Sequence, residues 1–247
     1  MRRRPPDGLD QVIAAALRVF ADKGYRRTQM SDVAREMRVA PGTLYGYVAG
    51  KEALFHLVVD RAFTADGHGS VPTLPIPTPP PGATLTRLRE RLAADSALAP
   101  LEAALRRSRP TDARAEIEAI VGALYDRIGG AWQGIVMLER SALDWPELAH
   151  VFYVEVRRRL LQRLERYLAA RAEAGMLAAA PSAPAAARFV LETVAWFAMH
   201  RHRDRDADLD EETARRTTIT LVANAFTRVD DRARPTRKTS RKESRRR

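Results

Sequence analysis

The residues best suited to do chemistry in this chain lie in one short segment, from Val39 to Gly50. On a helix that turns about 100° per residue, Leu44 and Val48 would point to one side of this segment. Small residues let a backbone approach a large partner closely, and hydroxyl groups can bond to phosphates and base edges. The opposite side carries residues of these two kinds, namely Gly42, Thr43 and Gly46, flanked by Tyr45 and Tyr47. The segment contains no Arg or Lys, so the most common guanine-reading side chain is missing from it.

Residues suited to catalysis or metal binding form no recognisable set. The chain has no cysteine, which excludes disulfides, thiolate metal sites and cysteine nucleophiles. His200 and His202 would point in different directions on a helix, so they cannot share a metal ion. The acidic run from Asp204 to Asp210 lacks the glycine and the glutamate that a calcium loop needs. We therefore expect no metal, no cofactor and no enzyme, although distant residues could still assemble an active site.

The positive charge of the chain is concentrated at its two ends. The formal net charge is +11, and Arg2–Arg4 together with residues 232–247 account for all of it. Basic tails of this kind can neutralise phosphates and release their counterions. The alternative is compositional, because nearly all basic residues of the chain are Arg. In neither case do the tails supply sequence specificity.

The elements that must position the central segment are short helices. Apolar residues at steps of three and four predict the first helix, and Thr28 is expected to cap the second. Pro41 suits the first turn of the third helix. This spacing is typical of a helix-turn-helix domain, in which the last short helix enters the major groove. The predicted helices cover residues 9–20, 29–37, 41–48 and 51–66.

The remaining sequence is a proline-rich break followed by further helices. Six prolines fall within residues 67–83 and predict a linker. Asp208 and Glu211 are spaced as a capping box for the last helix. No segment alternates as a β-strand would, so we predict an all-α fold. The later helices are expected at residues 84–98, 101–107, 112–128, 131–143, 146–174, 185–203 and 210–228.

These patterns divide the chain into four parts. We expect an N-terminal three-helix helix-turn-helix DNA-binding domain at 6–66, a linker at 67–83, a C-terminal helical domain at 84–229, and a basic disordered tail at 230–247. No apolar run approaches the ~20 residues that span a bilayer, and no secretory signal is recognisable. We therefore expect no membrane partner and a cytoplasmic protein.

The stretch from Thr28 to Leu54 reads TQMSDVAREMRVAPGTLYGYVAGKEAL and resembles the DNA-binding signature of the TetR family of bacterial regulators. The resemblance covers about residues 7–60 without gaps and includes the upstream FADKGY. Two positions depart from the family pattern, Arg38 in place of the usual glycine and Val48 in place of an aromatic residue. A side chain at a position with positive φ predicts local strain at Arg38.

The resemblance implies roles for residues of the second, third and fourth helices. Thr28 and Gln29 would anchor the DNA backbone or reach the groove edge, and Tyr45 and Lys51 would hold phosphates. Tyr47 is expected to point outward and to read bases, with simple packing as the alternative. The implied base-facing surface consists of Pro41, Gly42, Thr43, Gly46 and Tyr47.

The resemblance extends to residues 135–153, IVMLERSALDWPELAHVFY, which are similar to a stretch of many TetR C-terminal domains. It implies a homodimer formed by the last two helices, which suits two DNA half-sites about 34 Å apart. Burial of these helices in the protomer's own core is the alternative. The apolar stripes proposed for the interface contain Phe189, Val190, Val194, Phe197, Ile219, Val222 and Phe226.

The resemblance also implies that residues 84–229 form a ligand-binding and dimerisation domain of a nucleoid-associated bacterial protein. A small-molecule effector would be coupled to DNA through packing of the fourth helix on this C-terminal domain. The chain would then be a DNA-binding transcriptional regulator, a repressor that its effector releases from a double-stranded DNA operator. A helical adaptor that uses its tails for nonspecific nucleic-acid contact is the second hypothesis. Candidate residues of the effector pocket, with ordinary core packing as their alternative role, are Trp132, Met137, Trp145, Phe152 and Tyr153.

Overall fold

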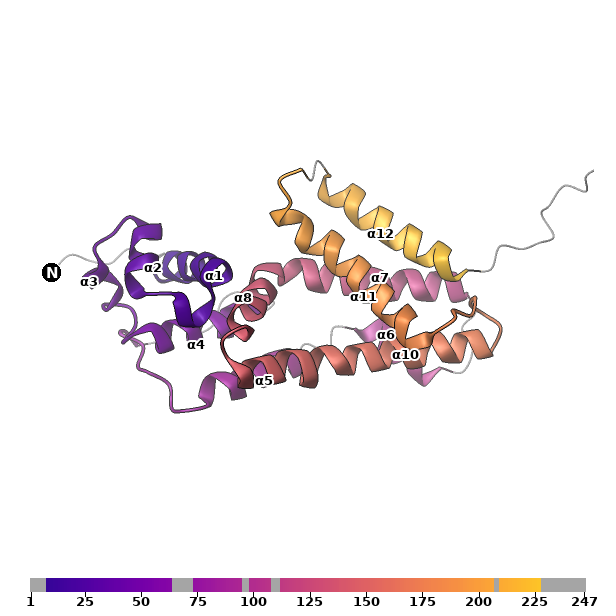
Figure 1. The fold of residues 1–247 in the computed structure, drawn as a ribbon, viewed down its shortest axis with the longest axis horizontal. Helices are drawn as coiled ribbons and strands as arrows, with labels where there is room; N and C mark the ends of the chain where they lie inside the picture. Colours follow the sequence, from indigo (N-terminus) through magenta and orange to yellow (C-terminus); the bar gives the residue numbers. More distant parts are fainter. Residues whose placement is uncertain (1–7, 64–72, 95–97, 108–111, 207–208, 228–247) are drawn as a thin grey trace, which may run out of the picture.

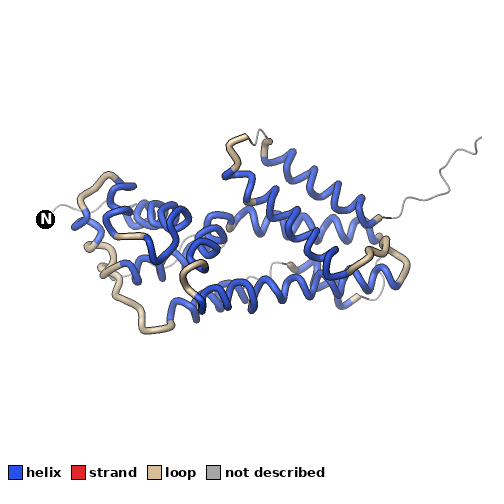
Figure 2. The backbone as a smooth tube through the Cα atoms, in the orientation of Figure 1, coloured by secondary structure: helices blue, strands red, loops and turns tan. Residues whose placement is uncertain are grey.

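The computed structural model describes residues 8–63, 73–94, 98–107, 112–206 and 209–227, and this part of the chain is helical, with no β-strand. The molecule is elongated, and its N-terminal helices gather at one end (Figure 1). Most described connections between the helices are short, and a longer loop leads into the helix that begins at Ala83 (Figure 2). The prediction of an all-α fold with a helix-turn-helix unit followed by a larger helical part is confirmed.

The N-terminal unit consists of the helices α1 Gly8–Arg27, α2 Met30–Met37, α3 Pro41–Leu44 and α4 Lys51–Ala62. Its core is formed by the apolar stripe of α1, which packs against the apolar sides of the other three helices. The third helix is shorter than expected, because the backbone after Tyr47 turns to pair with a later segment. The buried side chains include Val12, Phe20, Val33, Leu44, Val48 and Leu54.

Helix α1 bends sharply near its C-terminal end. Gly24 has φ 75° and ψ 169°, a combination that is essentially restricted to glycine. A Cβ atom at Gly24 would lie 2.8 Å from the carbonyl oxygen of Arg140, so the backbone of a distant helix occupies the space. The bend ends the main part of α1 and sets the direction in which the chain enters α2.

The proline-rich segment is partly fixed to the N-terminal unit. The Ile76 N–H donates to the Tyr47 carbonyl at 2.8 Å, and the Ile76 carbonyl accepts from the Ala49 N–H at 2.8 Å. These bonds make a short parallel bridge between Val48 and Ile76. The described residues of the predicted linker therefore serve as a strap beside α3, which the proline pattern alone did not indicate.

The next helix, α5 Ala83–Ala94, is tied to α4 by charge. The Asp60 carboxylate accepts hydrogen bonds from both Arg87 and Arg91, the latter at 2.6 and 2.9 Å. The two guanidinium groups lower the pKa of Asp60 against the opposing effect of burial. The path from α4 into the second part of the molecule is thus held by side chains as well as by the strap.

The second part continues with helices whose limits agree with the predicted ranges to within a few residues. Two predicted helices are divided. The structure splits 146–174 into three elements, the middle one a π-helical stretch with hydrogen bonds five residues apart, and it splits 185–203 into an α-helix and a 3₁₀ turn. The elements are α6 Ala99–Arg106, α7 Ala113–Gly130, α8 Trp132–Ala142, α9 Pro146–Ala149, the π-helix η1 His150–Arg157, α10 Arg158–Glu173, α11 Ala183–Ala198, the 3₁₀ turn η2 His200–Arg203 and α12 Glu211–Phe226.

Two hydrophobic cores meet on opposite sides of α8. Val136 belongs to the core formed by α7, α10, α11 and α12. Met137 and Leu138 belong instead to the core of the N-terminal unit, together with Leu148 and Phe152. The core of the helix-turn-helix unit therefore reaches into the second half of the sequence, and α8 is shared by both parts.

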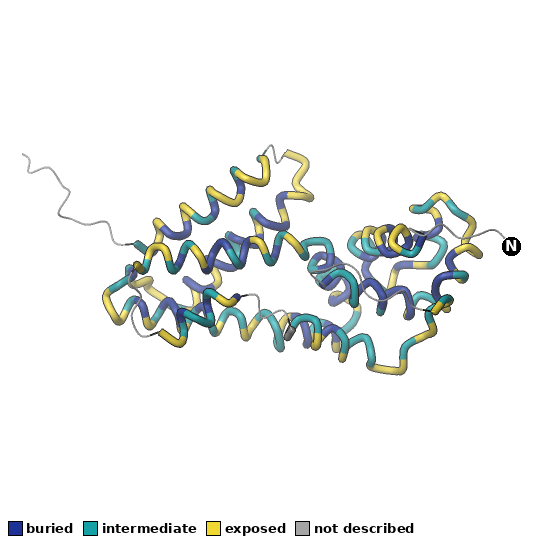
Figure 3. The backbone as a smooth tube through the Cα atoms, turned by 180° about the vertical axis from the view of Figure 1, so that it is seen from behind, coloured by how far each residue is buried: buried dark blue, intermediate teal, exposed yellow. Residues whose placement is uncertain are grey.

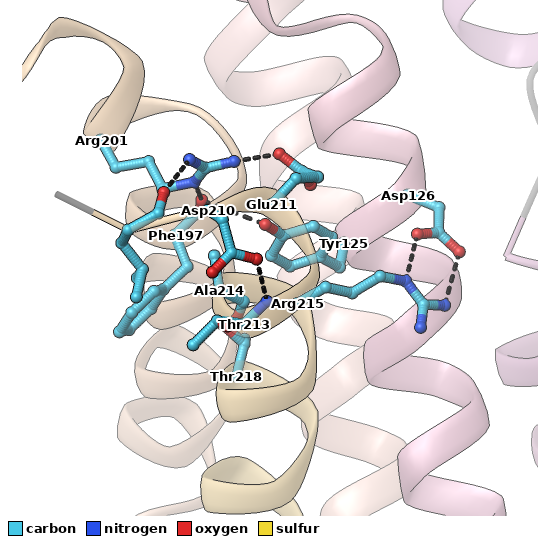
Figure 4. A network of polar contacts seen from close by, with 11 residues as sticks. Tyr125, Asp126, Phe197, Arg201, Asp210, Glu211, Thr213, Ala214, Arg215 and Thr218 are labelled. Atoms are coloured by element: carbon cyan, nitrogen blue, oxygen red, sulfur yellow. Dashed lines mark hydrogen bonds and ion pairs between the residues drawn. The ribbon is translucent and has the colours of Figure 1, made fainter. Parts of the chain in front are cut away.

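A polar network fixes the start of α12 against α7 and α11 (Figure 4). The buried Arg201 side chain donates to the carbonyl oxygens of Phe197 and Leu209 and pairs with Glu211. Asp210 caps α12 by accepting from the Thr213 N–H at 2.9 Å. The predicted capping residue Asp208 lies outside the described residues, and the capping box is corrected to this Asp210 cap.

The apolar stripes predicted for dimerisation are largely internal. Val190, Val194, Val222 and Phe226 are buried in the protomer's own core, so the alternative interpretation holds for them. Three large apolar side chains on these two helices are exposed, namely Phe189, which belongs to the predicted stripes, and Trp196 and Leu221, which do not. Exposed turns alternate with buried ones along α12 (Figure 3). Within the described residues, no helix is long and apolar enough to cross a membrane.

Candidate DNA-binding surface and internal cavity

The exposed side of α3 is a surface of small and hydroxyl residues. Pro41, Gly42 and Thr43 are exposed, and Tyr45 is 52% exposed. The other side of the same turn is Leu44, which is completely buried. We call the exposed residues 41–43 and 45 the α3 surface. The buried Leu44 holds this turn in place, and the exposed residues around it carry no charge. Such a turn can enter a groove of DNA with its exposed side first.

Gly42 is not needed by the fold. A Cβ atom built on Gly42 would meet nothing within 4 Å. The small size of this residue therefore leaves space outside the protein rather than inside it. Such space is what a close backbone approach to a large partner requires.

Tyr47 does not belong to the α3 surface, and the prediction that it points outward is wrong. The residue is only 6% exposed, and its ring lies in the core of the N-terminal unit. Its hydroxyl sits against Gly8 at the start of α1, where any Cβ atom would collide with it. The chain keeps turning after Leu44, since the Tyr47 N–H donates to the Leu44 carbonyl at 2.8 Å, and three steps of about 100° place Tyr47 close to the buried side of the turn, where α1 covers it.

Thr28 is also internal. It is 1% exposed, and its hydroxyl donates to the Gly24 carbonyl at 2.8 Å, so its side chain supports the bend of α1. The residue that precedes α2 is Gln29, which is exposed and takes the N-cap position predicted for Thr28. The Gln29 N–H donates to the Asp32 carboxylate at 2.9 Å, a reciprocal capping arrangement. Lys23 and this N–H hold the pKa of Asp32 below its usual value.

The turn between α2 and α3 contains the predicted positive φ. Arg38 has φ 57° and ψ 41°, the left-handed conformation in which glycine is the usual residue. Its N–H donates to the Arg35 carbonyl at 3.0 Å, which closes the end of α2. The side chain is exposed, so the strain is local to the backbone and the turn keeps its shape.

Lys51 lies at the start of α4, half-buried beside the end of α1. Its Nζ atom donates to the Arg26 carbonyl at 3.3 Å and lies 4.6 Å from the centre of the Tyr25 ring. Burial lowers the pKa of Lys51. Arg26 and Arg27 are exposed next to it. The three cations form a basic edge near the α3 surface, while Arg2–Arg4 and the tail 230–247 lie outside the described residues.

The basic edge is linked to α8 by a specific contact. The Tyr25 N–H donates to the Ser141 hydroxyl oxygen at 3.0 Å, directly after the Gly24 bend that rests on Arg140. Near the other end of α8, a Cβ atom at Gly134 would lie 2.9 Å from the Phe63 ring at the end of α4. Helix α8 therefore contacts both helices that carry α2 and α3.

A partly enclosed cavity of about 130 Å³ lies on the side of α8 that faces away from α1. Residues of α5, α7, α8, η1, α10, α11 and η2 contribute to its wall, together with Leu98 just before α6. Most of the wall is apolar, which is typical of sites for small organic ligands. Its apolar side chains include Leu124, Ile128, Ile135, Phe152, Leu191 and Met199.

Of the five residues predicted to line an effector pocket, Phe152 lines this cavity. Met137 is fully buried in the core of the N-terminal unit, and Trp132 stacks on His202 at 4.9 Å. Trp145 packs on the Tyr25 ring at 5.1 Å and lines a different pocket, beside Phe55 and the strap, and Tyr153 is 37% exposed. Trp132, Met137 and Tyr153 line neither of these two pockets, because their directions depend on the packing of the later helices, which the sequence pattern did not show.

The cavity also contains charged side chains that sequence reasoning missed. Arg157 pairs with Glu192, which also accepts from Arg188 at 3.1 Å. Burial raises the pKa of Glu139 and lowers that of Arg127 to about 10. Glu139 lies within residues 135–153, the stretch that resembles many TetR C-terminal domains. Only the packing of α8 shows that Glu139 faces the cavity. No group of metal-binding side chains occurs in the described part of the chain.

Comparison with known proteins identifies both halves. Residues 12–58 match the model of bacterial regulatory proteins of the tetR family, and residues 120–227 match that of the C-terminal domain of AefR-like transcriptional repressors. The first match contains α2, α3 and most of α1 and α4, and the second contains α8, α10, α11, α12 and part of α7.

Individual relatives agree with these models. The chain is 37% identical over 57 residues to the HTH-type transcriptional regulator YuxN of Bacillus subtilis, a match covering 22% of this chain and 20% of that protein. It is 40% identical over 52 residues to the fatty acid metabolism regulator protein of the same organism, covering 21% and 26%. The chain thus spans only about a fifth to a quarter of these relatives' length.

The whole fold resembles a solved regulatory protein of the tetR family from Rhodococcus RHA1. That likeness has a TM-score of 0.52 at 18% identity, and it covers 90% of this chain and 98% of the other. At this identity the likeness concerns the fold alone. With a matching N-terminal signature, a matching C-terminal domain and a shared architecture, the chain belongs to the TetR family of bacterial transcriptional regulators.

Proposed function

We propose that this protein is a transcriptional repressor that binds an operator through two copies of the α3 surface and is released by a small-molecule effector. The observation that carries the proposal is the contrast within one turn, where the exposed Gly42, Thr43 and Tyr45 are backed by a completely buried Leu44. An exposed, uncharged surface on a firmly supported short helix suits insertion into a major groove.

Within this proposal the residues have different roles. Thr43 and Tyr45 contact base edges and phosphates, while Gly42 and Pro41 allow the close approach. Gln29, Lys51 and the neighbouring basic edge bind the DNA backbone. The protein has regulatory rather than catalytic activity, and its working parts are the DNA-binding domain 6–66, the helical domain 84–229 and a basic tail 230–247.

The operator-binding form is a homodimer. Phe189 and Trp196 are seven residues apart, so they lie on one side of α11, and both are exposed. Leu221 on the adjoining α12 is 58% exposed. Large apolar side chains on two neighbouring helices suit an interface with a second copy of the same face. The network around Arg201 keeps these helices in place.

Coupling between effector and DNA runs through α8. One side of this helix contributes to the cavity, and its other side contacts α1 at Ser141 and α4 at Gly134. A ligand that shifts α8 therefore acts on both helices that position the α3 surface. Packing, rather than the strap of residues 73–82 alone, transmits a differential binding energy of a few kcal/mol.

The test begins with selection of bound fragments from bacterial genomic DNA by the full chain. Fluorescence anisotropy then measures affinity for the selected operator in the presence of competitor DNA. Thr43→Ala is expected to weaken specific binding about tenfold or more, because a base-edge contact contributes roughly 1–3 kcal/mol of discrimination. Thr220→Ala, an exposed threonine of α12, is the matched control and should leave affinity unchanged.

Equal affinity for the operator and for unrelated DNA would contradict the proposal. Binding that disappears when residues 230–247 are removed, with Thr43→Ala unaffected, would support the adaptor hypothesis instead. For the dimer, Trp196→Glu should reduce the dimeric fraction in analytical ultracentrifugation. Leu143→Glu, at another exposed apolar residue, should not.

A further inference from the structure

Glu139 is the charged group of the cavity that lacks a direct partner. Among the other charged residues of the wall, Arg157 pairs with Glu192, and Arg127 is engaged in an interaction of its own. Glu139 makes no hydrogen bond or ion pair with the described residues, and the groups that influence it act at longer range. Glu139 is partly buried on the wall of the cavity, and no described protein group donates to its carboxylate, so an ammonium group of a bound ligand could form a charge-assisted hydrogen bond with it.

We propose that the cavity binds a compact, mostly apolar organic amine whose ammonium group donates to the Glu139 carboxylate. This inference rests on the proposed effector function and names the class of effector. The neighbouring Arg157 donates to Glu192, an acceptor that it shares with Arg188, so Arg157 does not occupy the Glu139 carboxylate. An anionic ligand would place a second negative charge beside Glu139, and a purely apolar ligand would leave the carboxylate without a donor.

The size of the cavity limits the apolar part of the ligand. Its volume is about 130 Å³. An apolar protein cavity of ~150 Å³ holds one benzene molecule. A body of about one six-membered ring therefore fills the space beside Leu124, Ile135 and Phe152, with one methylene group between the ring and the amine.

The position of Glu139 connects this binding event to the DNA-binding unit. Glu139 lies on α8 immediately before Arg140, whose carbonyl closes the space at Gly24, and two residues before Ser141. A ligand drawn toward Glu139 thus bears on the turn of α8 that supports the end of α1. The same residues would anchor the ligand and pass its effect to the basic edge.

Four probes of similar shape separate the possible chemistries: benzylamine, benzyl alcohol, ethylbenzene and benzoate. Isothermal titration calorimetry of the full chain at neutral pH should give the tightest binding for benzylamine. An ion pair with a carboxylate is expected to favour it over benzyl alcohol by about tenfold to a hundredfold. Glu139→Gln, which keeps the shape of the side chain, should abolish this preference while benzyl alcohol still binds.

The matched control is Glu147→Gln, an exposed glutamate outside the cavity, which should retain the full preference. The inference is overturned if benzylamine does not bind at millimolar concentration, if benzoate binds more tightly, or if the preference survives in Glu139→Gln. Circular dichroism of each variant confirms that it is folded.

A second measurement separates this inference from the proposed function. Benzylamine is added to the complex with operator DNA, and release is followed by anisotropy. Binding with release that depends on Glu139 supports both. Binding without release supports the ligand class and contradicts the effector mechanism, whereas specific operator binding without amine binding contradicts the ligand class alone.

Acidification provides an independent check of the same group. The titratable and charged side chains that influence Glu139 are His200, Arg157, Arg203 and Glu192. Burial raises the pKa of Glu139, so lowering the pH protonates it before an ordinary exposed glutamate. As the pH is lowered from neutral and Glu139 becomes protonated, the preference of the native chain for benzylamine over benzyl alcohol should decrease. A preference that stays constant would contradict the role of Glu139 as the group that binds the amine.

Discussion

The α3 surface and the cavity are built in opposite ways. The α3 surface comes from consecutive residues between Pro41 and Tyr45, and one turn of helix decides which of them are exposed. The cavity takes residues from Leu92 to His200 and needs the packing of most of the later helices. A surface of the first kind can be recognised in a short motif, whereas a site of the second kind exists only after the helices have packed.

Helix α8 is where these two constructions meet. It lends Met137 and Leu138 to the core of the N-terminal unit and Val136 to the core of the C-terminal part. The functional division of the molecule therefore differs from the division suggested by the prolines. Four predictions test the contrast between the α3 surface and the cavity, in order of decreasing expected effect.

Replacing Tyr47 by Ala should cause the largest loss of stability. The ring is buried in the core of the N-terminal unit, and truncating a buried aromatic residue costs about 3–5 kcal/mol. Tyr45→Ala removes a ring that is 52% exposed and should change the free energy of unfolding by only about 0.5 kcal/mol. Urea denaturation of the full chain measures both. Equal losses would show that the two tyrosines do not divide into core and surface roles.

Gly24→Ala should destabilise the contact between α1 and α8. The new Cβ atom would lie 2.8 Å from the Arg140 carbonyl oxygen, at a φ of 75° that side chains rarely adopt. Strain and overpacking together are expected to cost about 2–4 kcal/mol. Gly42→Ala is the control, because its Cβ atom meets nothing and thermal unfolding should be unchanged. If Gly24→Ala melts at the native temperature, α8 does not hold this bend.

Ser141→Ala should have a smaller effect on stability and a distinct effect on regulation. It leaves the Tyr25 N–H without its side-chain acceptor, at a cost of about 1–3 kcal/mol. Operator binding should persist, but the change in operator affinity caused by the effector should decrease. Thr218→Ala, which removes a buried hydroxyl bonded within α12, serves as the comparison for stability alone. An unchanged effector response in Ser141→Ala would place the coupling elsewhere on α8.

Glu139→Gln should raise stability slightly at neutral pH. Burial raises the pKa of Glu139 in the folded chain, so its ionised form opposes folding. This cost is absent below the ordinary glutamate pKa of about 4.3, grows as the pH rises, and is complete above the raised pKa of the folded state. Melting temperatures of native and variant chains should therefore diverge from acid to neutral pH. Convergence over that range would mean that the carboxylate has a compensating partner.

Most helices and the segment that matches the family signature could be predicted from the sequence. Periodic apolar residues, the positions of Pro41 and Gly50, and the motif from Thr28 to Leu54 depend on neighbours a few residues apart, so they can be recognised without knowledge of the fold. The exposed Gly42 and Thr43 and the buried Leu44 follow from one helical rotation. The positive φ of Arg38 follows from its place in the turn.

Only the tertiary structure decided which side chains become internal and where the cavity lies. Tyr47 is internal because the absence of a side chain at Gly8 of α1 leaves space for its hydroxyl. Thr28 is internal because its hydroxyl donates to the Gly24 carbonyl of the same helix. Glu139 entered a cavity because several helices, distant in sequence, surround one side of α8. Periodicity shows which side of a helix is apolar, but any of several other helices could cover that side. Only the packing of the helices decides which of them are neighbours and where a cavity remains between them.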